Sequence, residues 1–311
     1  MKALQINKYG GSEVVEINSE ARQPKAAPEG VLIEIYAAGI NPADWKMRQG
    51  LFQSVMPLSF PAILGLDFSG KVAEIGAGAE KFKKGDEVFG EASVTVGGSF
   101  AEFTAVSVKN IAIKPKNLNF IEAAGLPLTG ASAYQVLVEH IALSSGQKIL
   151  IYGGAGGIGT FAIQIAKHLG AYVATTATGD DIAYVKKLGA NEVIDYKNEV
   201  FENKLKDFDA VFDTIGGETY TKSFQVLKKG GIIVSMIEKP NTELMEKYAV
   251  KAISQYTIVT SERLEKLAEL IEKNVLKVHV DTVFPLEEAA DALAYVEEGR
   301  AKGKVILEIK K

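Results

Sequence analysis

The sequence predicts an α/β protein that combines a β-rich, barrel-like part with a doubly wound parallel sheet. Residues 1–118 contain short strand-like runs separated by turns with glycine or proline, a spacing typical of a barrel. From residue 119 onwards, helical and strand-like segments alternate, which is typical of a parallel sheet covered by helices. Within that second part, a glycine-rich turn joins an apolar strand to a helix, and the rest of the chain is organised around it.

Five runs in the first part have the composition of strands. They end at turn residues and are Ala3–Ile6, Val31–Ala38, Phe68–Ile75, Glu87–Phe89 and Ala101–Val106. We expect a short helix after Asn41, because Pro42 suits a first helical position and residues 43–49 contain no helix breaker. Asn41 is then either a helix cap, which needs no ligand, or a residue of a domain cleft.

The second part begins with Asn119 and Glu122, which have the spacing of a capping box and open a helix that ends near Pro127. A second helix is expected over Thr129–Val138. The strands that follow are Lys148–Tyr152, Tyr172–Thr176, Glu192–Ile194, Ala210–Asp213 and Ile232–Met236, with helical segments between them.

After Thr260 the sequence predicts two helices, Glu262–Lys273 and Leu286–Glu298, and a final strand, Lys304–Ile309. This tail has the elements needed to close the first domain. We therefore expect one domain formed by residues 1–118 with 263–311 and another formed by residues 119–262.

The glycine-rich turn follows the apolar strand Lys148–Tyr152 and precedes the helical stretch Ile158–Leu169. Its glycines fit the G-x-G-x-x-G pattern: the first allows a tight turn, the second lets a pyrophosphate approach, and the third lets helix and strand pack closely. The alternative is a glycine turn that only connects the two elements. The strand-turn-helix context favours a dinucleotide site made of Gly154, Ala155, Gly156, Gly157, Ile158 and Gly159.

Composition excludes several other classes of protein. The 311 residues are 47% hydrophobic and 24% charged, which is the balance of an ordinary globular protein. A formal net charge of −4 and the lack of a basic cluster argue against nucleic acid as a partner. The sequence has no cysteine, and it shows neither a signal-peptide core nor an apolar run long enough to span a membrane, so we expect a cytoplasmic protein.

Several motifs in order along the whole chain resemble those of zinc-independent medium-chain dehydrogenase/reductases of the quinone oxidoreductase type. The segments are residues 37–50, AAGINPADWKMRQG; 60–76, FPAILGLDFSGKVAEIG; 83–90, KKGDEVFG; 126–134, LPLTGASAY; 150–159, LIYGGAGGIG; 188–190, LGA; 211–217, VFDTIGG; 227–235, LKKGGIIVS; and 284–292, FPLEEAADA. The resemblance implies a GroES-like β-barrel domain, formed by both ends of the chain, and a Rossmann domain that binds the dinucleotide.

Zinc-dependent relatives hold their catalytic ion with cysteine and histidine. This chain has no cysteine, its three histidines, His140, His168 and His279, lie far apart, and Gly65-Leu66-Asp67 stands where those relatives carry their histidine. The resemblance therefore implies a metal-free site.

In the proteins that this chain resembles, an asparagine and a threonine lie beside the nicotinamide, and here they are Asn41 and Thr129. Trp45 and Phe52 are candidates for an apolar wall around a flat acceptor. Phe52 stands where several relatives carry a tyrosine that is a candidate proton donor, so Tyr36, Tyr134 or a water molecule would have to replace it.

We expect NADPH as the cofactor, with NADH as the alternative. NAD-binding proteins usually have an acidic residue at the end of the second strand, and Thr176 occupies that position here. Asp180 and Asp181 either cap the next helix or bond a ribose. By resemblance, the other cofactor contacts are Thr178, Tyr196, Ile215 and Ser235.

The resulting prediction is a metal-free, NAD(P)H-dependent reductase of a quinone or similar conjugated carbonyl acceptor. The alternatives are an alkenal or enone double-bond reductase and a dinucleotide-binding structural or regulatory protein with little turnover. A homodimer is also expected, because the glycine-framed strand Gly231–Met236 would suit pairing across a two-fold axis if it lay at a sheet edge.

Overall fold

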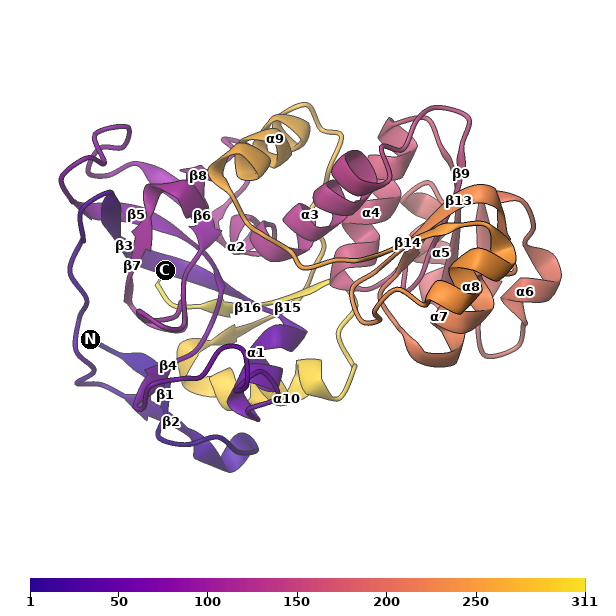
Figure 1. Cartoon of the computed structure of the whole chain (residues 1–311). Helices are drawn as coiled ribbons and strands as arrows, with labels where there is room; N and C mark the ends of the chain where they lie inside the picture. The colour runs from indigo at the N-terminus through magenta and orange to yellow at the C-terminus, as the bar shows by residue number, and fades with distance from the viewer. Residues whose placement is uncertain (311) are drawn as a thin grey trace. The chain divides into compact units, whose positions relative to one another are not determined.

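The structure is a computed structural model that describes residues 1–310 (Figure 1). The chain divides into two compact units. The first unit comprises Met1–Leu128, Val259–Asn274 and the chain from Val278 onwards, and the second comprises Thr129–Ile258 with Val275–Lys277.

The first unit is built mainly from two β-sheets. A three-stranded antiparallel sheet has the order β2 (Val15–Asn18), β1 (Ala3–Ile6), β4 (Ala62–Ile63). A larger sheet has the order β15-β16-β3-β5-β6-β8, and β7 also pairs with β3. Its strands are β3 (Gly30–Ile40), β5 (Asp67–Ile75), β6 (Glu87–Glu91), β7 (Phe103–Ser107), β8 (Ile111–Ile113), β15 (Val280–Pro285) and β16 (Lys304–Glu308).

The end of the described chain closes this larger sheet. Strand β16 pairs antiparallel with β3, with Val305 opposite Ile40. In Figure 1 the yellow C-terminal strand lies beside the purple strands of the N-terminal part. The helices of this unit are α1 (Pro42–Arg48), α2 (Phe120–Ala124), α9 (Ser261–Glu272) and α10 (Ala289–Glu297).

Helix α9 shows how a capping residue and helical spacing of apolar residues produce a helix where the sequence predicts one. The Thr260 hydroxyl accepts a hydrogen bond from the backbone N–H of Arg263 and so caps the helix. Leu264, Leu267 and Ile271 recur at helical spacing and are buried, so the helix presents one apolar face to the protein.

The second unit contains the predicted doubly wound parallel sheet, which is confirmed. Its strand order is β11-β10-β9-β12-β13-β14, and all pairs are parallel. The strands are β9 (Lys148–Ile151), β10 (Tyr172–Ala177), β11 (Glu192–Asp195), β12 (Phe208–Asp213), β13 (Leu227–Ser235) and β14 (Lys251–Ser254). This is the 3-2-1-4-5-6 order of two mononucleotide-binding halves, with the reversal between β9 and β12.

The helices of this part follow the sheet strands along the chain. They are α4 (Gly157–His168), α5 (Asp181–Lys187), α6 (Phe201–Lys204), α7 (Gly217–Ser223) and α8 (Thr242–Tyr248). The expected helix over Thr129–Val138 begins two residues earlier, as α3 (Pro127–Tyr134), and continues as a π-helical turn over Gln135–His140.

One prediction about the sheet is wrong. The expected strand Gly231–Met236 falls within β13 up to Ser235, and β13 is not at an edge, because it lies between β12 and β14. The strand β14 was not among the strands expected from the sequence; it has four residues and occupies the edge in the described part of the chain. A homodimer therefore remains a prediction, but it can no longer be based on β13 pairing with a second copy at a sheet edge.

Candidate functional site

The glycine turn after β9 is anchored to the end of the neighbouring strand β10. The N–H of Gly153 donates to the Thr176 hydroxyl oxygen at 3.0 Å, and the N–H of Gly154 donates to the Thr176 carbonyl at 3.1 Å. Gly153 has φ +62°, a left-handed conformation that favours glycine. The motif assigns the tight turn to Gly154; the structure corrects this, because the left-handed residue is Gly153.

Gly154 and Gly159 are required for close packing. A Cβ at Gly159 would lie 2.2 Å from the Gly153 carbonyl oxygen, and one at Gly154 would lie 2.3 Å from the Thr175 hydroxyl oxygen. Gly156 differs, because a Cβ there would meet the Gly153 carbonyl oxygen at 3.3 Å and no other heavy atom within 4 Å. The side of Gly156 is therefore open, as an approaching pyrophosphate requires.

Helix α4 begins directly behind this open turn. Gly156 is its N-cap, and Thr160 donates the first bond back to the Gly156 carbonyl at 3.0 Å. The N–H groups of Gly157, Ile158 and Gly159 precede that bond and lie at the positive end of the helix dipole. We call the turn Gly153–Gly156 and these three N–H groups at the start of α4 the glycine cradle. The cradle lies where the strand order reverses, and its close-packed glycines and free N–H groups fit the phosphates of a dinucleotide.

The end of β10 lies beside a carboxylate that was not among the residues predicted from the sequence. In register, Ala177 of β10 is opposite Asp195 of β11. The Asn198 amide and the Thr178 hydroxyl bond this carboxylate and hold the pKa of Asp195 below its usual value. Of the predicted cofactor contacts, Thr176 is buried, and its hydroxyl oxygen already accepts from Gly153, whereas Tyr196 is exposed.

Asp213 and Ser235 lie at the carboxyl ends of the neighbouring strands β12 and β13 and bind each other there. The buried Asp213 carboxylate accepts the N–H groups of Ile215 and Gly216, both at 3.0 Å, and the Ser235 hydroxyl at 2.6 Å. The Ser235 oxygen also accepts the N–H groups of Ile237 and Glu238. The Ser235 hydroxyl thus donates its one hydrogen to Asp213 within the protein. Ile215, the other cofactor contact predicted here, is 56% exposed.

In the first unit, Asn41 is both the N-cap of α1 and part of a buried polar cluster. Its amide nitrogen donates to Asp67 Oδ2 at 3.0 Å, and its amide oxygen accepts from Lys304 Nζ at 2.6 Å. Lys304 Nζ also lies 3.3 Å from Asp67 Oδ2, and Asp67 Oδ1 accepts the Leu128 N–H at 3.0 Å. The side chains of Asn41, Asp67 and Lys304 are all buried.

Two further carboxyls face this ion pair. Asp44 accepts the Asn41 N–H at 2.7 Å, and Glu91 lies opposite Asp67 across the β5–β6 pair. Burial raises the pKa of Asp44 to about 8, and burial with the charges of Asp67 and Asp44 raises the pKa of Glu91 to about 8. Lys304 thus interacts with Asp67 and Asp44, Glu91 is affected by the charges of those two carboxyls, and Asp44 and Glu91 keep their protons near neutral pH.

These protons predict a pH dependence of stability. The folded protein holds a proton on Asp44 that the unfolded chain has released, so the free energy of unfolding falls as pH rises from 6 to about 8 and then levels off. The slope is about 1.4 kcal/mol per pH unit for one group. Melting temperatures across pH 6–9 measure it, and Asp44→Asn, which keeps an oxygen for the Asn41 N–H, should make the profile less steep and leave the contribution of Glu91, whose pKa is also raised to about 8.

The exposed carboxylate Glu80 provides the matched control for this measurement. Glu80→Gln should leave the wild-type profile over pH 6–9 unchanged. An Asp44→Asn profile as steep as that of the wild-type protein would contradict the assignment of the proton to Asp44.

The remaining predicted site residues lie as follows. Trp45, on α1, and Phe52 are partly buried and pack against the same apolar core of the first unit. Thr129 is the third residue of α3 and is 5% exposed. Sequence reasoning missed Asp44, Asp67, Glu91 and Lys304 as a group; the nearest signal was the charged residue within the otherwise apolar or small stretch Leu64–Gly70.

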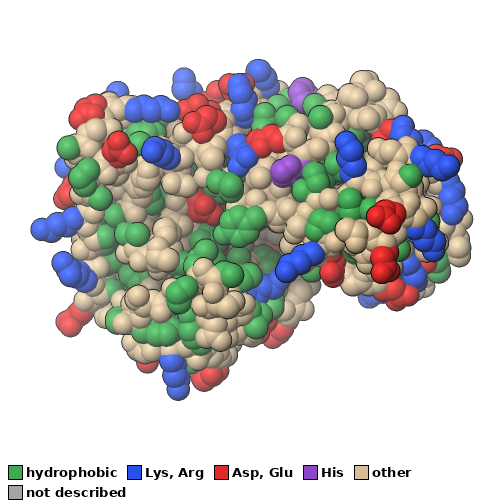
Figure 2. Space-filling view, viewed as in Figure 1, with side chains coloured by type: hydrophobic (Ala, Val, Ile, Leu, Met, Phe, Trp, Pro, Cys, Tyr) green, Lys and Arg blue, Asp and Glu red, His purple; other side chains and the backbone are tan. Residues whose placement is uncertain are grey.

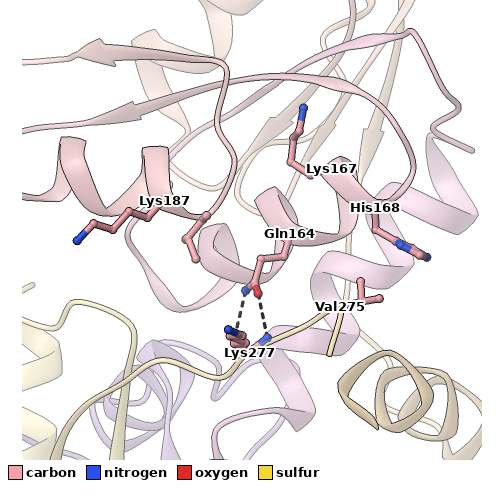
Figure 3. A pocket seen from close by; sticks show the side chains of 7 residues that line it. Gln164, Lys167, His168, Lys187, Val275 and Lys277 are labelled. Carbon is pink, nitrogen blue, oxygen red and sulfur yellow. Dashed lines mark hydrogen bonds between the residues drawn. The ribbon is translucent and has the colours of Figure 1, made fainter. Parts of the chain in front are cut away.

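A hollow of about 420 Å³ in the second unit is separate from the cradle (Figure 3). Gln164, Lys167 and His168 line it, and the Gln164 side chain bonds the backbone of Lys277. Lys167 is ten residues beyond the start of α4, about 15 Å along the helix axis, so this pocket lies toward the C-terminal part of the helix and not at its N-terminus.

Three observations bear on metal ions, membranes and polyanionic partners. Within residues 1–310, no group of three or more His, Cys, Asp or Glu could hold a metal ion, and no helix is long and apolar enough to cross a bilayer. Figure 2 shows Lys or Arg side chains interspersed with Asp or Glu side chains over the visible face, unlike the single-sign surface of a nucleic-acid-binding protein.

Two family models match parts of this chain. The model described as alcohol dehydrogenase GroES-like domain matches residues 27–116, and the model described as zinc-binding dehydrogenase matches residues 188–307. The first match covers five strands of the larger sheet, β3, β5, β6, β7 and β8, and β4 of the smaller one. The second includes β11 to β16, although the chain has no cysteine.

Whole-chain relatives agree with these matches. The chain is 39% identical over 321 residues to a 2-methylene-furan-3-one reductase of Solanum lycopersicum and 38% identical over 320 residues to an NADPH-dependent alkenal/one oxidoreductase of Arabidopsis thaliana. Each alignment covers 99% of this chain and 79% of the relative. The solved quinone oxidoreductase of Coxiella burnetii is 32% identical, with a TM-score of 0.91 and coverage of 100% of this chain and 99% of that one.

The GroES-like part and the doubly wound sheet with its glycine cradle define the fold of a medium-chain dehydrogenase/reductase. Identity above 30% over nearly the whole chain identifies the branch: this chain belongs to the quinone oxidoreductase-like family of these enzymes.

Proposed function

We propose that this protein is an NADPH-dependent reductase that transfers hydride to a quinone or a similar conjugated carbonyl compound. The glycine cradle at the start of α4 is the observation that carries the proposal, because its close-packed glycines and open helix N-terminus suit a pyrophosphate. Bound NADPH supplies the hydride. The protein contributes binding, orientation and exclusion of water.

The choice of NADPH over NADH has support and one opposing charge. The Arabidopsis relative is named as NADPH-dependent, and Thr176 leaves no acidic group at the end of β10. Asp195 is the opposing charge, because its lowered pKa keeps it ionised where β11 ends beside β10. A carboxylate near a 2′-phosphate is repulsive and lowers the affinity for NADPH relative to NADH, unless the hydrogen bonds from Thr178 and Asn198 and the charge of Lys197 offset the repulsion. The ratio of the two affinities measures the net effect.

Asn41 and Thr129 are the proposed catalytic residues. An amide carries two N–H hydrogens, and Asp67 accepts from the Asn41 nitrogen, so the other hydrogen is the one proposed to stabilise a developing oxyanion. The bond from Lys304 to the Asn41 oxygen polarises the amide and strengthens it as a donor. Trp45 and Phe52 are the proposed apolar contacts of a flat acceptor.

Steady-state oxidation of NADPH with a panel of quinones, enals and enones tests the proposal. We expect turnover with at least one conjugated acceptor, unchanged by a strong chelator, since the chain has no cysteine and its three histidines lie far apart in sequence. Loss of activity together with a stoichiometric metal ion would refute the metal-free assignment. Binding of NADPH without turnover on any acceptor would favour the structural or regulatory alternative.

The acceptor panel also separates the second candidate, an alkenal or enone double-bond reductase. The names of the tomato and Arabidopsis relatives favour this candidate. It requires protonation of a carbon atom after hydride transfer, whereas a quinone takes its protons on oxygen. Products saturated at the carbon–carbon double bond would identify the second candidate.

Variants of the proposed catalytic residues test their roles in the same assay. Asn41→Ala and Thr129→Val should lower turnover by about 10²-fold, the effect of losing one oxyanion donor, with cofactor affinity retained. Because Asn41 is also a helix cap and a hydrogen-bond partner of Lys304, the melting temperature of the Asn41→Ala variant must be measured together with its turnover. Lower stability with full turnover of the folded fraction would make both residues structural.

A further inference from the structure

Gln255 lies immediately after β14, and its buried side chain has no partner among the described residues. Its backbone N–H donates to the Ser235 carbonyl at 2.7 Å, which extends the pairing of β14 with β13 by one residue. The side chain is buried, and within residues 1–310 neither its Oε1 nor its Nε2 has a hydrogen-bond partner. Leaving such an amide unpaired costs about 1–3 kcal/mol for each group, so a bound group that supplies both bonds would remove this cost.

The position of Gln255 indicates which group that is. Strands β12, β13 and β14 form the second mononucleotide-binding half of the sheet, and ligands bind at the carboxyl ends of such strands (Figure 1). At this edge, Asp213 and Ser235 bond each other and the following backbone. Gln255, by contrast, has both a donor and an acceptor left to offer at this edge.

Gln135 provides an informative contrast within the same unit. Its Oε1 accepts the Ile258 N–H at 3.1 Å, and its Nε2 donates to the Tyr256 carbonyl at 3.4 Å. The side chain of Gln135 is therefore hydrogen-bonded to the segment 255–258. The side chain of Gln255 belongs to the same segment and is also buried, but it has no hydrogen-bond partner in the described part of the chain.

We infer that the Gln255 side chain binds the carboxamide of the nicotinamide ring through a pair of hydrogen bonds. The Gln255 nitrogen donates to the carboxamide oxygen, and the Gln255 oxygen accepts from the carboxamide NH₂, because two primary amides are complementary in this way. The ring is then held in one orientation, which selects the face from which hydride leaves. This inference rests on the proposed function, because it requires a nicotinamide dinucleotide as the ligand.

Binding measurements that need no turnover test the inference. Three ligands are titrated by intrinsic fluorescence: NADPH, its 3-acetylpyridine analogue, which lacks the NH₂ donor, and 2′-phospho-ADP-ribose, which lacks the ring. Gln255→Leu should weaken NADPH about tenfold, as expected for the loss of about 1.4 kcal/mol, and leave 2′-phospho-ADP-ribose unchanged. The wild-type protein should prefer NADPH to the analogue, and the variant should bind both equally.

Melting temperature in the absence of ligand supplies a second readout, with Gln135→Leu as the matched control. Gln255→Leu removes an unpaired buried amide and should keep or raise the melting temperature, whereas Gln135→Leu removes the two hydrogen bonds from Gln135 to the Ile258 N–H and the Tyr256 carbonyl and should lower it. Gln135→Leu should also leave the preference for NADPH over the analogue unchanged.

The possible failures are distinguishable. Equal loss of NADPH and 2′-phospho-ADP-ribose in Gln255→Leu, or no loss of either, would overturn the role of Gln255 and leave the proposed function intact. If the wild-type protein bound neither ligand, the proposed function would fail and the inference with it.

Discussion

Lys304→Met is expected to destabilise the protein by about 3–5 kcal/mol at neutral pH. Lys304 Nζ is buried, donates to Asn41 Oδ1 at 2.6 Å and lies 3.3 Å from Asp67 Oδ2. Methionine fills similar volume but removes the cation that offsets the burial of Asp67, whose pKa burial already raises, and the donor to Asn41 Oδ1. Asp67 must then either take up a proton or remain an unpaired buried charge, and both cost stability. Chemical denaturation at pH 7 measures the change in the free energy of unfolding.

Two comparisons separate this charge effect from a packing effect. Lys310 pairs with Glu34 at the surface, so Lys310→Met should change stability by less than about 1 kcal/mol. Adding Asp67→Asn to Lys304→Met removes the unpaired charge and should restore part of the loss. If the double variant were as unstable as the sum of both single variants, the ion pair would not be the cause.

Gly159→Ala is expected to weaken dinucleotide binding by about 10²-fold or more, because small displacements of a binding element have effects of this size. The added Cβ would lie 2.2 Å from the Gly153 carbonyl oxygen and 2.8 Å from Gly154 Cα, and both are backbone atoms that cannot rotate away. The turn must therefore separate from α4, which displaces the N–H groups that face the phosphates. Titration with NADPH and with 2′-phospho-ADP-ribose measures the loss.

Gly156→Ala is the matched variant in the same turn. A Cβ at this position meets the Gly153 carbonyl oxygen at 3.3 Å, a tight contact that a shift of a few tenths of an ångström relieves. We expect a much smaller loss of stability for Gly156→Ala than for Gly159→Ala, and weaker binding for both. Full cofactor affinity in Gly159→Ala would contradict the assignment of the cradle.

Local signals in the sequence were sufficient to predict several elements of the fold and the cradle. The run Lys148–Ile151 is β-branched and apolar, and the glycines after it break the strand abruptly, so β9, the turn and α4 were predicted close to their actual bounds. Pro42 and Asn41 likewise placed the start of α1 correctly, because helix caps depend on neighbouring residues. The motif identified the cradle glycines, because the packing of a strand-turn-helix unit recurs in the same spacing.

Other features became visible in the folded chain alone, because they depend on partners far away in the sequence. Lys304 and Asp67 are 237 positions apart, and their pairing follows from the sheet order β16-β3-β5, which no local pattern specifies. The edge position of β14 and the use of the Ser235 hydroxyl by Asp213 were missed for the same reason. The π-helical turn at Gln135–His140 was missed as well. The hydrogen bonds and the pKa of a side chain are set by burial and by its neighbours in space. The sequence therefore specified where Asn41 and Gln255 stand in the chain, and packing decided that within residues 1–310 the first is paired and the second is not.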